Sequence, residues 1–231
     1  MNLKEFIKYE LKGWQKTEIA ALAVVFLIVV FNAVFLRDSK AAVISAFCGI
    51  LYSTMAGKGK ISCYLFGLMG TSFYSYLSLK NSLYGNLLLY VCYYFPMQLW
   101  GIFAWKKHLK TTTKEIIKAK LSSPERLRLF LLAALLCVFA ILILKYFKDS
   151  RPVFDGITTV LSILGMYLTV KRCIEQWIIW MIVNGLSALM WLSLIVNGTK
   201  AYSTFIMWAV YLILAVYFYI VWRKELKTEE D

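Results

Sequence analysis

Eight apolar runs of roughly membrane length divide the chain, and shorter polar segments separate them. A hydrocarbon core about 30 Å thick requires about 20 apolar residues in helical form, so runs of this length predict membrane-spanning helices. None of them shows the strict alternation of a transmembrane β-strand. The sequence therefore predicts an all-α polytopic membrane protein with helices over residues 18–36, 41–56, 61–79, 83–105, 128–145, 155–170, 176–197 and 201–222.

Composition and charge agree with a membrane location. Of the 231 residues, 61% are hydrophobic, which leaves too little polar surface to cover a soluble globule. The net charge of +13 does not indicate nucleic-acid binding, because the basic residues are scattered over short loops rather than gathered in one patch. Nineteen of the 26 Lys and Arg residues lie in alternate segments that begin with the N-terminus. Since such residues are retained on the cytoplasmic side, both termini are predicted to be cytoplasmic.

The segments outside the core helices have distinct patterns. Residues 1–17 alternate charged and apolar groups at helical spacing, which predicts an amphipathic helix on the cytoplasmic membrane surface. The run 18–36 is predicted to be an additional transmembrane helix rather than a cleaved signal peptide, because a mostly polar stretch precedes it. Residues 106–127 are predicted to form a basic cytoplasmic loop or surface helix with a Ser-Ser-Pro break, and residues 223–231 a cytoplasmic tail.

Two three-helix segments match in helix length and loop position. When they are aligned, Trp105 with the two lysines after it corresponds to Trp222 with Arg223 and Lys224. Residues 41–105 and 155–222 are therefore predicted to be two repeats joined by the connector helix 128–145. A single connector gives both repeats the same orientation, which is the parallel 3+1+3 arrangement of the SWEET type. That arrangement predicts a substrate site at the repeat interface near the membrane midplane.

Two predicted helices carry an amide among aromatic rings on one face. In the run 176–197, steps of three and four residues place on one face Trp177, Trp180, Asn184, Ser187 and Trp191. In the run 83–105, similar steps align Tyr94, Gln98, Gly101 and Trp105. An amide inside a membrane costs free energy unless a partner satisfies it, and here we expect that partner to be a ligand.

The sequence lacks the residues and motifs that most kinds of ion coupling and catalysis need. Away from their ends, the apolar runs contain no Asp, Glu, Lys, Arg or His, and this favours transport without ion coupling. The chain has no phosphate-binding loop, HExxH motif or nucleophile elbow, so we expect neither an enzyme nor a cofactor or metal requirement. Aromatic rings stack on flat rings and attract cations, and amides bind amide or sugar groups. Together they suit a neutral or cationic aromatic nucleoside.

The stretches YYFPMQLWGIFAW and EQWIIWMIVNGLSALMW resemble the PnuC-type vitamin transporters, whose known members carry nicotinamide riboside. The resemblance covers about residues 41–224. It implies a homotrimer in the bacterial inner membrane that works by facilitated diffusion, with the substrate trapped when a cytoplasmic kinase phosphorylates it. It also implies that the substrate is bound by Gln98, Trp100, Gly101, Trp105, Trp177, Trp180 and Asn184.

Three alternatives remain open at this stage. Relatives with the same scaffold are thought to carry thiamine, riboflavin or deoxynucleosides. A membrane interaction protein without transport activity would fill its aromatic faces with neighbouring side chains. Finally, some aromatic residues lie where belts of Trp and Tyr form at membrane interfaces, namely Trp105, Trp222, Tyr84 and Tyr202.

Overall fold

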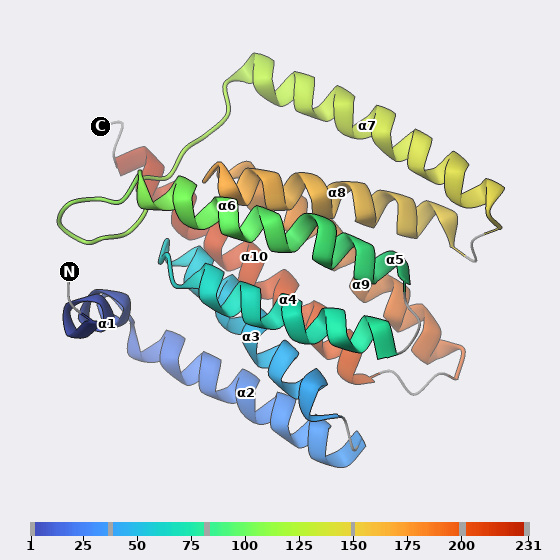
Figure 1. The fold of residues 1–231 in the computed structure, drawn as a ribbon, viewed down its shortest axis with the longest axis horizontal. Coiled ribbons are helices and arrows are strands. Elements are labelled where there is room, and N and C mark those ends of the chain that lie inside the picture. Colours follow the sequence, from blue (N-terminus) through green and yellow to red (C-terminus); the bar gives the residue numbers. More distant parts are fainter. Residues whose placement is uncertain (1–2, 37–38, 81–83, 149–150, 199–201, 229–231) are drawn as a thin grey trace. The chain divides into compact units, whose positions relative to one another are not determined.

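The computed structural model describes residues 3–36, 39–80, 84–148, 151–198 and 202–228 (Figure 1). These residues are helical apart from their connections, where two isolated β-bridges form. The elements are α1 (Leu3–Leu11), α2 (Lys16–Leu36), α3 (Lys40–Gly57), α4 (Cys63–Lys80), α5 (Tyr84–Leu89), η1 (Tyr90–Tyr94), α6 (Phe95–Lys106), α7 (Ser123–Tyr146), α8 (Pro152–Val170), α9 (Glu175–Val196) and α10 (Tyr202–Thr228).

Seven helices in the described residues are long and apolar enough to cross a membrane. One of them, Leu87–Lys106, combines α5, η1 and α6, and α4 is not among the seven. The helix α4 falls in the predicted run 61–79, but its Gly, Ser, Thr and Tyr residues lower its mean hydropathy. The protein is therefore an all-helical, multi-pass membrane protein. The finer arrangement of eight spanning helices in a 3+1+3 order stays a prediction.

The start of α7 differs from the predicted boundary. The sequence predicts that the Ser-Ser-Pro stretch belongs to a loop or surface helix ending at residue 127, whereas α7 begins at Ser123. Ser122 and Glu125 form a capping box, in which the Glu125 carboxylate accepts a hydrogen bond from the Ser122 backbone N–H at 2.8 Å. Pro124 fits the first turn because the N–H that it lacks has no helical partner there. The helix therefore begins before the predicted start at residue 128, because the Ser-Ser-Pro stretch with Glu125 is a helix-start signal.

The helix that carries Gln98 changes its winding before Pro96. The sequence predicts an interruption here, because proline has no backbone N–H to donate. The structure has a five-residue π-helical segment, η1, in which the Phe95 N–H donates to the Tyr90 carbonyl five residues earlier. Such wide turns are frequent at functional sites. The chain then continues directly into α6, which carries the Gln98 side chain.

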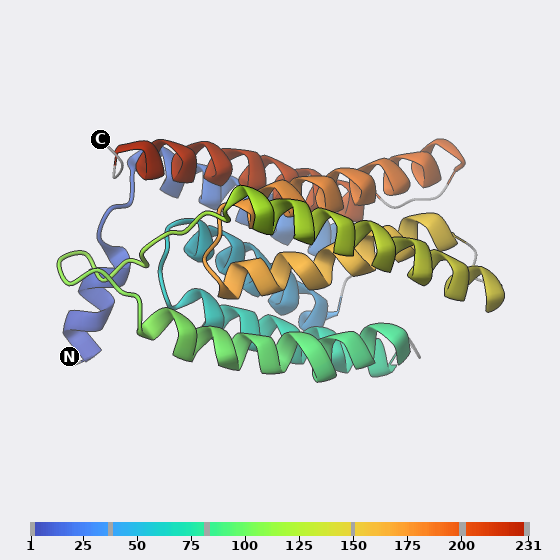
Figure 2. The same ribbon diagram turned by 90° about the horizontal axis from the view of Figure 1, so that it is seen from above.

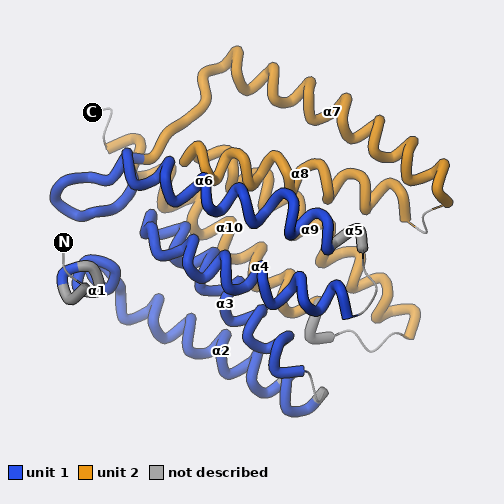
Figure 3. Tube along the Cα trace, viewed as in Figure 1, with its two compact units in different colours: residues 1–117 blue, residues 118–231 orange. Residues whose placement is uncertain are grey.

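The chain divides into two compact units, residues 1–117 and 118–231 (Figure 3). In the first unit, α4 packs against α3 and against the helix formed by α5, η1 and α6. In the second unit, α9 packs between α8 and α10, and α9 and α10 run side by side in both views (Figures 1 and 2). Helix α7, the predicted connector, buries none of its residues. Its apolar surface suits a lipid environment.

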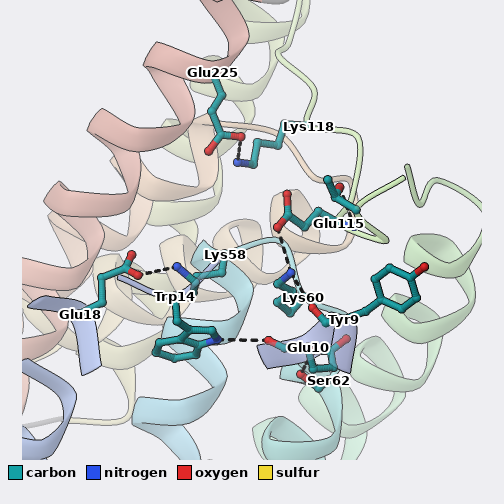
Figure 4. Close-up of polar contacts among 11 residues, drawn as sticks. Tyr9, Glu10, Trp14, Glu18, Lys58, Lys60, Ser62, Glu115, Lys118 and Glu225 are labelled. Carbon is teal, nitrogen blue, oxygen red and sulfur yellow. Dashed lines mark hydrogen bonds and ion pairs between the residues drawn. The ribbon is translucent and has the colours of Figure 1, made fainter. Parts of the chain in front are cut away.

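Polar groups gather where α1 meets the turn between α3 and α4 (Figure 4). The Lys60 side chain is only 1% exposed, and its ammonium group donates to the Tyr9 carbonyl at 3.0 Å and to the Glu115 carboxylate at 2.9 Å. Ser62 donates a hydrogen bond to the Glu10 carboxylate. Since a buried ammonium group is costly without such partners, these contacts hold α1 against the turn between α3 and α4.

Burial raises the pKa of the Glu10 carboxyl above its ordinary value of 4.5, although the Ser62 hydroxyl and the Lys60 charge oppose the shift and Glu115 adds to it. The folded protein therefore binds more protons than the unfolded chain between pH 4.5 and the raised pKa. Stability should fall as the pH rises through that window. We expect Glu10→Gln to remove this part of the pH dependence of thermal unfolding, while Glu5→Gln, an exposed residue of the same helix, leaves it unchanged. Parallel curves for wild type and Glu10→Gln would contradict this expectation.

Candidate substrate-binding site

In the first unit, the Gln98 amide is held by the neighbouring helix α4. Gln98 is 5% exposed, and its Nε2 donates to the Thr71 hydroxyl at 2.8 Å. Its Oε1 accepts no hydrogen bond from the described residues. A Cβ atom at Gly67 would lie 3.1 Å from this oxygen, so the absence of a side chain there makes room for the amide. The Gln98 amide thus has a fixed donor and a buried, unsatisfied acceptor.

Gly101 and Trp105, which follow Gln98 on the same face, enclose Tyr64. A Cβ atom at Gly101 would lie 2.2 to 2.5 Å from Tyr64 ring and hydroxyl atoms, so only glycine fits here. The Trp105 ring is fully buried and meets the Tyr64 ring edge-on at 5.0 Å between centroids. Gly101 and Trp105 therefore support the site through packing in this structure. The belt interpretation of Trp105 is wrong, because its ring has no exposed surface.

The π-helical segment carries a cluster of tyrosines. The Tyr94 ring lies 4.9 Å from the Tyr90 ring, which stacks on Tyr74 of α4 at 4.3 Å. The 4.9 Å separation of ring centroids is typical of aromatic pairs, and the 4.3 Å separation is a close stacking contact. Trp100 lies on α6 but is 44% exposed, so it does not share the buried environment of Gln98. Of the residues predicted on this helix, Gln98 is the one with a buried polar atom that has no partner in the described residues, and Tyr94 contributes a ring to the tyrosine cluster.

In the second unit, Trp180 and Asn184 lie one turn apart on α9. The Trp180 indole N–H donates to the Thr169 hydroxyl of α8 at 3.3 Å. Its ring packs on Gly165, where a Cβ atom would lie 3.0 Å away. Asn184 is 6% exposed, and its amide makes no hydrogen bond with any described residue. The expected combination of a positioned aromatic ring and an unsatisfied amide is therefore present.

Trp177 lies near the N-terminal end of α9, on the same predicted face, and is 4% exposed. Its ring lies 5.5 Å from Phe218 and 5.6 Å from Trp222, both on α10. Within the described residues, its indole N–H has no hydrogen-bond partner. Trp222 is fully buried in this aromatic cluster, so its interpretation as part of a belt is also wrong. The side chains of Tyr84 and Tyr202, the other two belt candidates, lie outside the described part of the chain.

The last two predicted residues of this face extend it toward the other end of α9. Ser187 is 6% exposed, and Trp191 is partly exposed. Sequence reasoning missed three polar residues beside the predicted ones: Gln176, Thr71 and Thr169. Gln176 is 1% exposed and its Nε2 has no partner in the described chain. Its position beside Trp177 was a usable signal, whereas the two threonines lie on other helices and no spacing rule points to them.

The described residues hold no group of three or more His, Cys, Asp or Glu side chains suited to a metal ion. What they offer is a set of buried amides and indoles on membrane-spanning helices. Such a set can bind a small polar ring by stacking and hydrogen bonding. Fold and site together define a multi-pass helical membrane protein with the features of a small-molecule transporter.

Comparison with known proteins gives the particular family. Residues 39–224 match the nicotinamide mononucleotide transporter family, and the chain belongs to it. It is 36% identical to the nicotinamide riboside transporter PnuC of Neisseria mucosa, over 93% of this chain and 84% of that one. It is 29% identical to PnuC of Haemophilus influenzae, over 98% and 99% of the two chains. A crystal structure of the vitamin B3 transporter PnuC is similar with a TM-score of 0.83 and 34% identity, covering 99% of both chains.

Proposed function

We propose that this protein takes up nicotinamide riboside across the bacterial inner membrane. One observation carries the proposal beyond the names of the relatives: Gln98 Oε1 is buried without a hydrogen-bond partner in the described residues. The amide of Asn184, a residue that is only 6% exposed, likewise makes no hydrogen bond with a described residue. Buried polar groups are almost always satisfied in proteins, so a ligand is the natural partner. The unused amide capacity favours a ligand over the alternative of a membrane protein without one, although neighbouring rings do pack against Trp105 and Trp177 as that alternative expects.

In the proposed complex, each part of the substrate has a chemical counterpart. The carboxamide NH₂ donates to Gln98 Oε1, and Asn184 binds the remaining carboxamide or ribose groups. The pyridinium ring stacks on Trp180, where its positive charge adds roughly 0.5 to 2 kcal/mol of cation–π attraction. The other predicted residues line the site or hold these three in place: Trp177, Trp100, Tyr94, Gly101, Trp105, Ser187 and Trp191.

The proposed site also favours the riboside over its 5′-phosphate. None of the predicted binding residues carries a positive charge, so a phosphate group would enter the membrane without a cationic partner. Binding of nicotinamide riboside, nicotinamide mononucleotide, thiamine, riboflavin and thymidine to the purified protein by calorimetry tests this. We expect nicotinamide riboside to bind at least about tenfold more tightly than the others. Tighter binding of another compound would assign that substrate instead, and binding of none would support a protein without transport activity.

The transport mechanism that we propose is facilitated diffusion by a homotrimer whose termini are cytoplasmic, with eight spanning helices in the 3+1+3 arrangement. The uncharged interiors of the apolar runs support uncoupled movement. In proteoliposomes, labelled nicotinamide riboside should equilibrate to equal concentrations inside and outside. An imposed proton or sodium gradient should not change that end point, whereas an enclosed kinase with ATP should raise the total label inside. Accumulation of unmodified substrate under an ion gradient would refute uniport.

A further inference from the structure

An apolar groove lies within the second unit, between the connector α7 and helix α8. Its volume is about 340 Å³, within the range of small-molecule sites. Five residues of α7 between Leu136 and Leu144 and four of α8 between Gly156 and Ile163 line it, and Thr159 is the one polar side chain among them. The groove contains no residue of the predicted substrate site.

Helices α7 and α8 lie close together at one end and diverge from there (Figure 1). At the close end, a Cβ atom on Gly156 would lie 2.9 Å from the Ile141 side chain and 3.2 Å from its backbone nitrogen. Glycine at this position lets the backbones meet. The α7 residues that line the groove lie on both sides of this contact, from Leu136 to Leu144, and they give it apolar walls.

The dimensions of the groove match one leaflet of a bilayer. The α7 residues that line it span about 12 Å at 1.5 Å per residue, and half of a typical hydrocarbon core is about 15 Å. Directly after them come Tyr146 and Phe147, which are 81% and 74% exposed. Exposed aromatic residues at a helix end mark the level of the lipid headgroups. The groove therefore begins at headgroup level and ends near the middle of the membrane.

Positive charge lies at the headgroup end of the groove. Lys145 and Lys148 flank the two aromatic residues, both are exposed, and neither forms an ion pair within the described residues. Arg151 follows at the start of α8, with Asp155 as the acidic residue of its first turn. Lysine ammonium groups beside an apolar groove suit a phosphate attached to an acyl chain, because ammonium and phosphate groups form charge-assisted hydrogen bonds.

We propose that this groove binds an anionic glycerophospholipid, with one acyl chain between α7 and α8 and its phosphate beside Lys145 and Lys148. The lipid fills the space that the diverging helices leave, and so supports the connector, which buries no residue of its own in the chain. The proposal does not depend on which substrate the protein carries.

Native mass spectrometry of the full-length protein tests the proposal, because it counts bound lipids and reports the oligomer mass together. The probes are phosphatidylglycerol and phosphatidylcholine with identical acyl chains. We expect the wild type to prefer phosphatidylglycerol at least about fivefold, and the variant with Lys145→Gln and Lys148→Gln to lose this preference. Equal retention of both lipids by the wild type would overturn the headgroup assignment.

A second variant tests the groove itself. Ala140→Phe places a ring in the groove and should reduce the retention of both lipids, whereas Ala134→Phe, at an exposed position of α7 outside the groove, should not. Unchanged lipid binding in Ala140→Phe would overturn the acyl-chain site. Dissociation of the oligomer by Ala140→Phe with the lipid count unchanged would also overturn it, since a second copy would then be the occupant.

Discussion

Asn184→Ala should weaken the binding of nicotinamide riboside at least about tenfold, which corresponds to ~1.4 kcal/mol. The Asn184 amide is buried and has no partner among the described residues, so the hydrogen bonds that it gives the substrate are not replaced by others when it is removed. Calorimetric titration of the purified variant measures the effect. Asn197→Ala is the matched control, because this amide caps the end of the same helix and donates to the Ser193 carbonyl at 2.9 Å.

Trp180→Ala should have an effect at least as large, because it removes the stacking surface together with its contacts on Gly165 and Thr169. Trp180→Phe keeps a flat ring but loses the hydrogen bond to Thr169, so an intermediate affinity is expected. Thermal unfolding of each variant separates lost binding from lost folding. If affinity were unchanged in both Asn184→Ala and Trp180→Ala, the assignment of the site to this face of α9 would be wrong.

Gly101→Ala should give the largest loss of stability, about 1 to 3 kcal/mol. The added methyl group would lie 2.2 to 2.5 Å from Tyr64 atoms, closer than any real contact. Tyr64 is fully buried, with Trp105 against one edge and Tyr52 nearby at 6.3 Å, so it has little room to move. The melting temperature of the detergent-solubilised variant measures the loss.

Gly185→Ala is the control for this prediction, because a Cβ atom at Gly185 would meet nothing within 4 Å. Alanine is also the better helix former, by roughly 0.5 to 1 kcal/mol, so this variant should be as stable as the wild type or more so. Combining Gly101→Ala with Tyr64→Leu should recover part of the loss, because the smaller side chain frees space. Equal melting temperatures for Gly101→Ala and the wild type would show that Tyr64 can move aside.

Most helices could be predicted from the apolar runs, and the errors concern their ends. The helix α10 continues to Thr228, beyond the predicted end at residue 222, and α8 begins at Pro152 rather than at residue 155. Hydropathy marks only the part of a helix that lies in the membrane. Helix ends depend on caps such as Ser122 with Glu125, which lie in water and carry no apolar signal.

The amino-acid sequence by itself determined that this chain is a helical membrane protein and that aromatic residues and amides share one face of two of its helices. Those properties follow from local spacing and the length of apolar runs. Only the tertiary structure decided which of those residues find packing or hydrogen-bond partners within the protein. Trp105 and Gly101 pack against Tyr64 of another helix, whereas Gln98 Oε1 and the Asn184 amide find no partner in the described chain. Hydrogen bonding and close packing between helices depend on side chains far apart in sequence, so no periodicity within one helix predicts them.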